Sequence, residues 1–192
     1  MDSNNNDRSK PFRLARTTVY ESPWVNLYLD TVSFPNGRVI EKYHLLDYPN
    51  PAVMVVVENT IGQVLFVRIC RYTTGQTNWE IPAGGVEPGE DLLAAARREV
   101  LEETGYALRS LRLVHSYYPQ NGIGNKVFHV LFGTAGERQQ TLDDGEVSGV
   151  CWFSRAAVEQ KLDQGEITDG GSLVALLLWL RWQGRHSEAI EC

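Results

Sequence analysis

The sequence predicts an α/β (α+β) sandwich, in which helices pack against a mixed β-sheet, preceded by a small β-hairpin subdomain. Two apolar runs, AVMVVVE at 52–58 and QVLFVRIC at 63–70, are typical of strands buried on both faces. A helix is expected from about 90 to 103, with Gly105 as its C-terminal stop. Alternating residues on both sides of the PNG turn at 35–37 predict the hairpin.

The second half of the chain continues the same pattern of strands and helices. Strands are expected near 111–118, 126–134 and 147–153, followed by a helix that begins after Ser154. A last helix, capped by Asp169 or Ser172 and ended by Gly184, contains the most apolar run of the chain, LVALLLWL. That run is far shorter than the roughly 20 residues that span a bilayer, so no membrane partner is expected.

Composition and charge limit the classes of function. The net charge of -6 argues against a surface that binds nucleic acid. The three cysteines form no C-x-x-C pair and leave one unpaired in any disulfide scheme, which favours free thiols and a cytoplasmic location. The polar start lacks the apolar core of an export signal, and residues 1–16 are expected to form a disordered tail.

An acidic cluster on the predicted helix carries the clearest chemical signal. In REVLEETG, residues 98–105, Glu99, Glu102 and Glu103 stand at i, i+3 and i+4 and therefore crowd one side of the helix. Like charges at this spacing cost a helix roughly 0.2–0.5 kcal/mol per pair. A solvated face in which Arg98 pairs with Glu102 would be the plain structural explanation.

The surroundings of the cluster favour a metal site over a solvated face. The preceding loop, PAGGVEPGE, is rich in small residues that allow a ligand to approach the backbone. Every candidate ligand here is an oxygen, with no His or Cys, so the expected ion is Mg²⁺, with Mn²⁺ as a substitute. Carboxylate-held Mg²⁺ typically acts on phosphates. The chain has no other phosphate-binding loop and no hydrolase elbow.

At this point the sequence resembles a known family. Gly84, then Glu90, then the run from Arg98 to Gly105 is similar to the complete Nudix box of the Nudix hydrolases; Tyr106, in place of a bulky aliphatic residue, is a mild departure. The resemblance implies a sheet–helix sandwich and hydrolysis of a nucleoside diphosphate linked to another group. By position it implies that Mg²⁺ is held by Glu99, Glu102, Glu103 and the carbonyl of Ala83. It also implies that Arg98 and Glu90 orient these ligands.

The resemblance extends from about Thr17 over nearly the whole chain, toward ADP-ribose pyrophosphatases and related nucleotide-sugar hydrolases. VRICRYTTGQTNWEIPAGG, FPNG and GEITDGGSLVALLLWL carry it. It implies an N-terminal β subdomain at 17–48 that builds a homodimer, a Nudix domain at 49–184 and a C-terminal tail at 185–192. Arg71 and Glu80 match positions that line the substrate pocket. Trp24 is a weaker candidate for stacking on the base, with a dimer-interface or core aromatic as the alternative.

A catalytic base is expected outside the box, because the box glutamates are occupied as ligands. Related ADP-ribose pyrophosphatases place a glutamate on a loop shortly before a late strand. The matching loop here is LDDGEVSG, in which Glu146 is the expected base and Asp144 the nearest substitute. A polar turn without a catalytic role is the alternative, since Gly145 and acidic residues are common in turns. A box glutamate or a chain of water molecules would then accept the proton.

One departure concerns the substrate. The related enzymes carry a proline about sixteen residues past the box glycine, where this chain has Asn121, with Pro119 two residues earlier. ADP-ribose is therefore the leading substrate, with GDP-mannose, CDP-sugars and other nucleoside diphosphates open. The expected reaction gives a nucleoside monophosphate and a sugar phosphate. The alternatives are a pyrophosphatase that removes modified nucleoside triphosphates and a non-catalytic sensor of nucleotide sugars.

Overall fold

The computed structural model describes residues 9–140, 145 and 147–187, with side chains through residue 184. The chain divides into two compact units. The N-terminal unit comprises Met1–Asn50 and Gln120–Lys126, and the sandwich unit comprises Pro51–Pro119 and Val127–Cys192. The sequence did not predict that residues 120–126 belong to the first unit.

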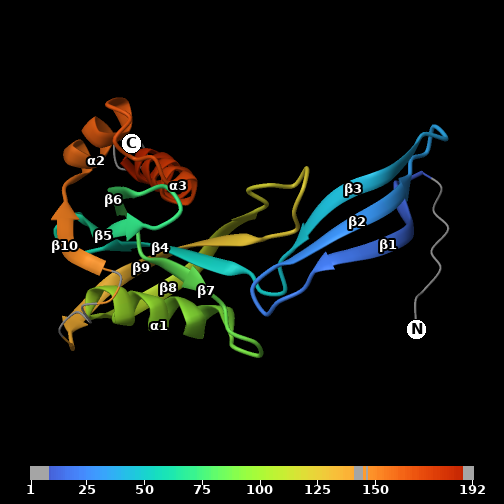
Figure 1. Cartoon of the computed structure of the whole chain (residues 1–192). Coiled ribbons are helices and arrows are strands. Elements are labelled where there is room, and N and C mark those ends of the chain that lie inside the picture. Colours follow the sequence, from blue (N-terminus) through green and yellow to red (C-terminus); the bar gives the residue numbers. More distant parts are fainter. Residues whose placement is uncertain (1–8, 141–144, 146, 188–192) are drawn as a thin grey trace. The chain divides into compact units, whose positions relative to one another are not determined.

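The N-terminal unit is a three-stranded antiparallel sheet with the order β1-β2-β3 (Figure 1). Its strands are β1 (Phe12–Tyr20), β2 (Asn26–Ser33) and β3 (Val39–Asp47). β2 and β3 form the expected hairpin. β1 corrects the sequence prediction, because it begins inside the stretch of residues 1–16 that was expected to be a disordered tail. All nine residues of β1 are exposed, so no buried face marked this strand in the sequence.

The segment at residues 120–126 completes the N-terminal unit beside β3. The backbone N–H of Leu46 donates to the carbonyl of Ile123 at 2.8 Å, and the N–H of Asn125 donates to the carbonyl of Leu46 at 3.2 Å. The hydroxyl of Tyr43 donates to the carbonyl of Gly122 at 2.7 Å. The segment therefore extends the hydrogen bonding of β3 although it follows that strand by more than seventy residues.

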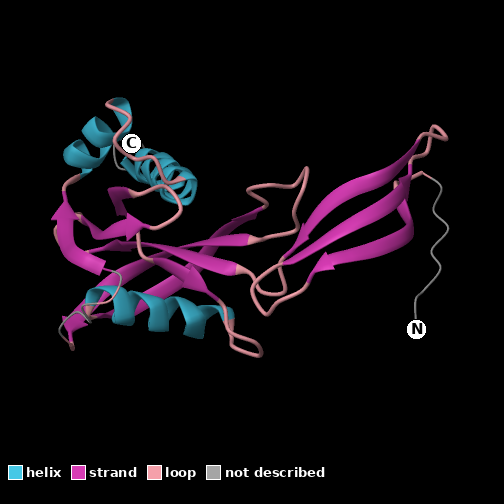
Figure 2. Ribbon diagram, in the orientation of Figure 1, coloured by secondary structure: helices cyan, strands magenta, loops and turns pink. Residues whose placement is uncertain are grey.

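The sandwich unit is built on a seven-stranded mixed sheet (Figure 2). Five strands follow the order β10-β5-β4-β9-β8, while β6 pairs with β5 and β7 pairs with β4. β4 and β9 run parallel, and the other pairs are antiparallel. The strands are β4 (Ala52–Glu58), β5 (Val64–Arg71), β6 (Gln76–Glu80), β7 (Ala83–Gly85), β8 (Tyr106–Tyr117), β9 (Phe128–Arg138) and β10 (Val147–Phe153).

The central strand β4 is buried on both faces, as its continuous apolar sequence predicted. Val53, Val55 and Val57 join the apolar cluster that contains the inner side of α1 (Leu92–Thr104). Met54 and Val56 point the other way, into a cluster with α2 (Arg155–Asp163) and α3 (Gly170–Ser187). Alternate residues of one strand therefore supply both cores, which gives the α/β/α layering seen in Figure 1.

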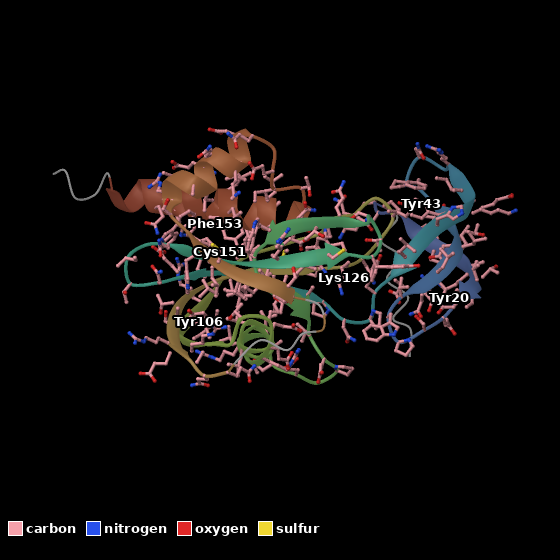
Figure 3. All side chains as sticks on the ribbon, turned by 60° about the vertical axis from the view of Figure 1, so that its left-hand side comes forward. Tyr20, Tyr43, Tyr106, Lys126, Cys151 and Phe153 are labelled. Carbon is pink, nitrogen blue, oxygen red and sulfur yellow. The ribbon has the colours of Figure 1, made fainter. Side chains whose placement is uncertain are left out.

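Side chains on the two faces of the sheet confirm this layering. Phe153 contacts Phe66 and Trp79 edge to face in the cluster beneath α2 and α3. Tyr106 contacts Trp152 in the same manner on the α1 side. Figure 3 labels Phe153 and Tyr106 on opposite sides of the sheet. The predicted α/β sandwich with a mixed sheet is thus confirmed.

The helices also follow the sequence pattern, with one difference. α2 begins after Ser154, whose hydroxyl accepts the N–H of Ala157. α3 continues to Ser187 and so passes Gly184, where the sequence predicted its end. Within the described part of the chain, no helix combines the length and apolar character needed to cross a membrane.

Candidate active site

Helix α1 is held in place by caps at both ends. The Asp91 carboxylate accepts the N–H groups of Leu93 and Ala94 at 2.9 and 3.2 Å. At the other end Gly105 has a φ of 76°, a conformation that glycine adopts without steric cost. Buried Ala96 and Val100 anchor the inner face of the helix on the sheet, so the orientation of the neighbouring acidic face is fixed.

Two of the three box glutamates lie against strand β7. The Glu99 carboxylate, 13% exposed, occupies the space that a Cβ atom on Gly84 would fill. A carboxylate oxygen of Glu103 accepts the N–H of Ala83 at 3.1 Å. Glu102 differs, because 57% of its side chain is exposed. A larger residue at position 84 would displace the Glu99 carboxylate from this position.

Arg98 connects the remaining parts of the box. Its guanidinium donates to both carboxylate oxygens of Glu90, at 2.9 and 3.0 Å. It also donates to Glu99 at 2.8 Å, to Glu102 at 3.2 Å and to the carbonyl of Gly85 at 2.9 Å. One arginine therefore fixes the loop that follows β7 and two glutamates of α1. The sequence did not predict the Gly85 carbonyl, because a backbone acceptor carries no side-chain signal.

Burial and charge shift the pKa values of this group in different directions. Burial raises the pKa of the Glu99 carboxyl, and the nearby Arg98 only partly opposes this effect. The hydrogen bond from Arg98 lowers the pKa of Glu90, and the same bond raises the pKa of Arg98. Burial thus disfavours the charged form of Glu99, and a second cation nearby would stabilise that form.

The donor set of this site fits a hard divalent cation. Glu99 and Glu103 offer carboxylate oxygens beside the backbone of β7, and Ala83 offers a carbonyl. Among the residues that the structure describes, however, no three Asp, Glu, His or Cys side chains converge as a metal cage. The Arg98 guanidinium donates to one carboxylate oxygen of Glu99 and to one of Glu102, so it holds both side chains on the same side of the helix.

A second charged pair lies within electrostatic reach of the box. Arg71, at the end of β5, donates to the Glu80 carboxylate with a shortest distance of 2.6 Å. Glu80 is 3% exposed and Arg71 is 42% exposed. The hydrogen bond that Arg71 donates to Glu80 raises the pKa of Arg71, and the charges of Asp169 and Glu103 raise it further. The two predicted pocket residues are therefore brought together near Glu103, with the guanidinium facing solvent.

The start of α3 is tied to the strand that carries Glu80. The buried hydroxyl of Ser172 accepts the N–H of Ile81 at 3.0 Å. The Asp169 carboxylate accepts the N–H of Ser172 at 2.6 Å. The sequence predicted these two residues only as helix caps. Their role in holding the Glu80 strand was missed, since the two ends of the contact are 91 residues apart.

Other predicted site residues lie elsewhere or outside the described residues. Trp24 belongs to the N-terminal unit, in the connection between β1 and β2, and is 84% exposed, which excludes a core aromatic. Asn121 is an exposed residue of the same unit. The two candidates for the catalytic base, Glu146 and Asp144, lie outside the described residues, next to Gly145 and the start of β10 at Val147.

Comparison with known proteins identifies the family. The sequence model of the NUDIX domain matches residues 48–173, well over half of the 192 residues, and this range includes α1, β7 and the Arg71–Glu80 pair. The chain belongs to the NUDIX family. The Nudix domain is preceded by a match to the nucleoside diphosphate sugar hydrolase N-terminal domain at residues 13–46, the range of β1 to β3.

Individual relatives agree with this assignment over most of the chain. An ADP-ribose pyrophosphatase from Bacillus subtilis is 27% identical over 85% of this chain and 89% of its own length. A CMP-5'-(N-acetyl-N-hydroxy-3-aminopropyl)phosphonate hydrolase from Streptomyces rubellomurinus is 25% identical over 88% of this chain and 82% of its own. A crystal structure described as an ADP compounds hydrolase superposes with a TM-score of 0.79 at 21% identity, covering 92% of this chain and 97% of that one. This Nudix fold is therefore shared along nearly the full chain.

Proposed function

We propose that this Nudix hydrolase cleaves the pyrophosphate bond of a nucleoside diphosphate sugar, with ADP-ribose as the leading substrate. Water is consumed, a phosphorus–oxygen bond of the pyrophosphate breaks, and a nucleoside monophosphate and a sugar phosphate are released. The observation that carries the proposal is the box on α1 and β7. There the Glu99 carboxylate lies against Gly84, and Glu103 accepts the N–H of Ala83. Arg98 donates a hydrogen bond to Glu99.

The proposed metal is Mg²⁺, which Mn²⁺ can replace. Its ligands would be Glu99, Glu102, Glu103 and the carbonyl of Ala83, since all four offer the oxygen atoms that these ions prefer. When bound, Mg²⁺ neutralises phosphate charge and activates a water molecule. Arg98 then acts as a positioning residue, because its contacts with the carboxylates orient the ligands.

Other residues of the sandwich unit would bind the substrate and accept a proton. The solvent-facing Arg71 is held by Glu80 and is suited to bind an oxygen-rich part of the substrate. The proposed general base is Glu146, with Asp144 as the alternative, because the box glutamates are committed to the metal. This base would take the proton of the attacking water.

The N-terminal unit is proposed to build a homodimer. Its outer strand β1 is exposed throughout, and several large apolar side chains of the unit are at least 40% exposed: Phe12, Leu14, Val19, Tyr20, Trp24 and Val39. Exposed edge strands and apolar surfaces are commonly covered by a partner. Trp24 would then either lie in the interface or stack on a base, as an exposed aromatic side chain can do.

Two observations bear on the choice of substrate. The match of residues 13–46 to a nucleoside diphosphate sugar hydrolase domain favours a nucleotide sugar over a nucleoside triphosphate. The Bacillus subtilis relative is named for ADP-ribose, whereas the Streptomyces relative is named for a CMP-linked phosphonate. Asn121 stands where the related ADP-ribose pyrophosphatases have a proline, so GDP-mannose, CDP-sugars and similar compounds are also candidate substrates.

A substrate panel tests the proposal. The protein is incubated with Mg²⁺ and either ADP-ribose, GDP-mannose, a CDP-sugar or a set of nucleoside triphosphates, and the products are identified by chromatography and mass spectrometry. The Glu103→Gln variant, purified in the same way, measures contaminating hydrolase. Release of a nucleoside monophosphate and a sugar phosphate supports the proposal. Selective pyrophosphate release from triphosphates, or binding of a nucleotide sugar without turnover, would overturn it.

A further inference from the structure

A hollow lies in the sandwich unit, on the face of the sheet that is opposite to α1. It has a volume of about 280 Å³ and lies between the sheet and the C-terminal half of α3. Val56, Phe132, Trp179 and Trp182 give it apolar walls, and Glu58 and Arg112 lie among its polar residues. Because the box glutamates lie along α1, this hollow is a separate site.

The strand register places the polar residues of the hollow in two adjacent rows. Glu58 pairs with Thr134 and Thr134 with Ser110, across β4, β9 and β8. The hydroxyls of Ser110 and Thr134 share a hydrogen bond of 2.7 Å. In the next row Val56 pairs with Phe132, which pairs with Arg112. The sheet therefore presents a carboxylate and two hydroxyls beside an apolar row that ends in a guanidinium.

Arg112 is held by aromatic rings rather than by an acid. Its guanidinium carbon lies 4.0 Å from the centroid of the Trp182 ring and 5.3 Å from that of Phe132. Among the described side chains, at residues 9–140, 145 and 147–184, the guanidinium interacts with these two rings and forms no ion pair. Ring contact uses the face of the guanidinium and leaves the N–H donors along its edge available to an anion.

Glu58 lies in a different environment within the same hollow. Its carboxylate accepts the indole N–H of Trp179 at 3.3 Å and the amide of Gln183 at 3.0 and 3.2 Å. The negative charge of Glu58 and the C-terminal half of α3 both disfavour an anion nearby. An anionic group in the hollow is therefore directed to Arg112, and neutral hydrogen-bonding groups suit the row of Glu58 and the hydroxyls.

We propose that this hollow binds a small organic anion, in which one carboxylate or phosphate group pairs with Arg112 and a planar apolar body lies against the aromatic walls. The volume of about 280 Å³ is near the lower end of the range for ligand pockets, which fits a ligand of one or two rings. Carboxylate and phosphate both match the fork of the guanidinium. This site extends beyond the proposed hydrolysis and does not depend on it.

Four probes separate the charge from the body of the ligand. Benzoate and phenyl phosphate carry both, benzyl alcohol carries the body without charge, and inorganic phosphate carries charge without the body. Binding to the ¹⁵N-labelled full chain is followed through the indole N–H signals of Trp179 and Trp182, assigned with single Trp→Phe variants. Trp79 and Trp152, which are absent from the lining of the hollow, serve as internal references. This readout also separates the hollow from any binding of phenyl phosphate at the box.

Benzoate or phenyl phosphate should shift the signals of Trp179 and Trp182, and should bind more tightly than benzyl alcohol and inorganic phosphate. Arg112→Met should weaken this binding by about tenfold or more, because a charge-assisted hydrogen bond is lost. Arg109→Met, which removes an exposed arginine of the same strand outside the hollow, should leave it unchanged.

The proposal is wrong if benzyl alcohol binds as tightly as benzoate, if the charged probes leave both indole signals unmoved, or if Arg112→Met binds like the natural protein. Circular dichroism checks that the variants fold. Should Arg112→Met not fold, the comparison of benzoate with benzyl alcohol on the natural protein decides by itself.

Discussion

The two units of this chain are stabilised in different ways. In the sandwich unit, β4 supplies alternate residues to two apolar clusters, and its valines are almost completely buried. Among the described residues of the N-terminal unit, only Tyr28 and Asp30 have buried side chains. There the Asp30 carboxylate accepts two hydrogen bonds of 2.8 Å from Arg16, whose guanidinium also lies 4.0 Å from the Tyr28 ring.

This difference indicates that the two units have different requirements for stability. Apolar burial contributes roughly 25 cal/mol per Å², so the two clusters of the sandwich unit provide a driving force of their own. A small sheet needs an apolar face packed against something to be stable by itself. The described residues of the N-terminal unit offer strand pairing and the Arg16–Asp30 ion pair in place of such a core. We therefore expect this unit to depend on a partner, while the proposed chemistry belongs to the sandwich unit.

The largest expected effect comes from the proposed base in the sandwich unit. Glu146→Gln removes the proton acceptor, so kcat should fall by about 10²–10⁴. Steady-state kinetics at saturating Mg²⁺ should show KM nearly unchanged, because the lost interaction belongs to the transition state. A loss of less than tenfold would reject Glu146, and the same measurement would then be made on Asp144→Asn.

The next effect concerns the metal site on α1. Glu103→Gln keeps the size of the side chain but removes one anionic ligand, so kcat should fall by about 10²–10³, as for the loss of one electrostatic contact in a transition state. Thermal unfolding should show equal or greater stability, because repulsion with Glu99 is relieved.

A matched control for the proposed metal site is Glu159→Gln on α2, which removes a surface carboxylate that pairs with Arg155. This variant should retain full activity. Activity in Glu103→Gln close to that of the natural protein would show that Glu103 does not bind the metal. Light scattering should give both variants the same mass, since both residues belong to the sandwich unit.

A substitution in the N-terminal unit should change the catalytic activity less and the oligomeric state more. Leu14→Glu places a charge on the exposed strand β1, where Leu14 is 56% exposed. Light scattering should show a shift from twice the mass of the chain to its single mass. Ile61→Glu, at a 77% exposed apolar residue of the sandwich unit, should leave the mass unchanged. A monomeric natural protein at micromolar concentration would contradict the dimer.

The smallest effect is a pH dependence confined to the N-terminal unit. The hydrogen bond from Arg16 lowers the pKa of Asp30, so the charged form is stabilised in the folded state. This stabilisation is present above the usual aspartate pKa of about 3.9 and is lost as the pH falls through the lower folded value. Asp30→Asn should remove this dependence, at a cost of about 1–3 kcal/mol.

Hydrogen exchange measures this effect in both units at once. Protection factors of the β2 amides should fall below about pH 4, while those of β4 remain constant over the same interval. An equal loss of protection in the two strands would show that the units unfold together, and would remove the distinction between them.

Much of the sandwich unit could be predicted from the sequence because its signals are local. Three such signals are the apolar run of β4, the stop at Gly105 and the spacing of the box glutamates. Each of them is contained in a short stretch of sequence. The pairing of Arg98 with Glu102 could be expected from the same short stretch, whereas the link between Arg98 and Glu90 was implied by the family resemblance. Strand β1 was missed because none of its residues is buried, so no hydrophobic pattern distinguishes it from a polar tail.

Contacts between distant residues were not predictable in the same way. The hydrogen bond between Ser172 and Ile81 joins elements that are 91 residues apart, and nothing in either segment indicates the other. The approach of Glu99 to Gly84 also depends on how α1 crosses β7, which the sequence does not state. Arg71 and Glu80 were expected from a resemblance to line the substrate pocket. Their ion pair and its electrostatic link to Glu103 come from the structure.

The segment at residues 120–126 has a consequence for how the chain folds during synthesis. Strand β3 is complete at Asp47, but Ile123 and Asn125, which hydrogen-bond to Leu46, emerge from the ribosome only after α1 and β8. Such non-local contacts form late, because a long loop must close first. A nascent chain that ends before residue 120 therefore lacks part of its first unit, and a fragment cut at residue 50 would not be an independent domain.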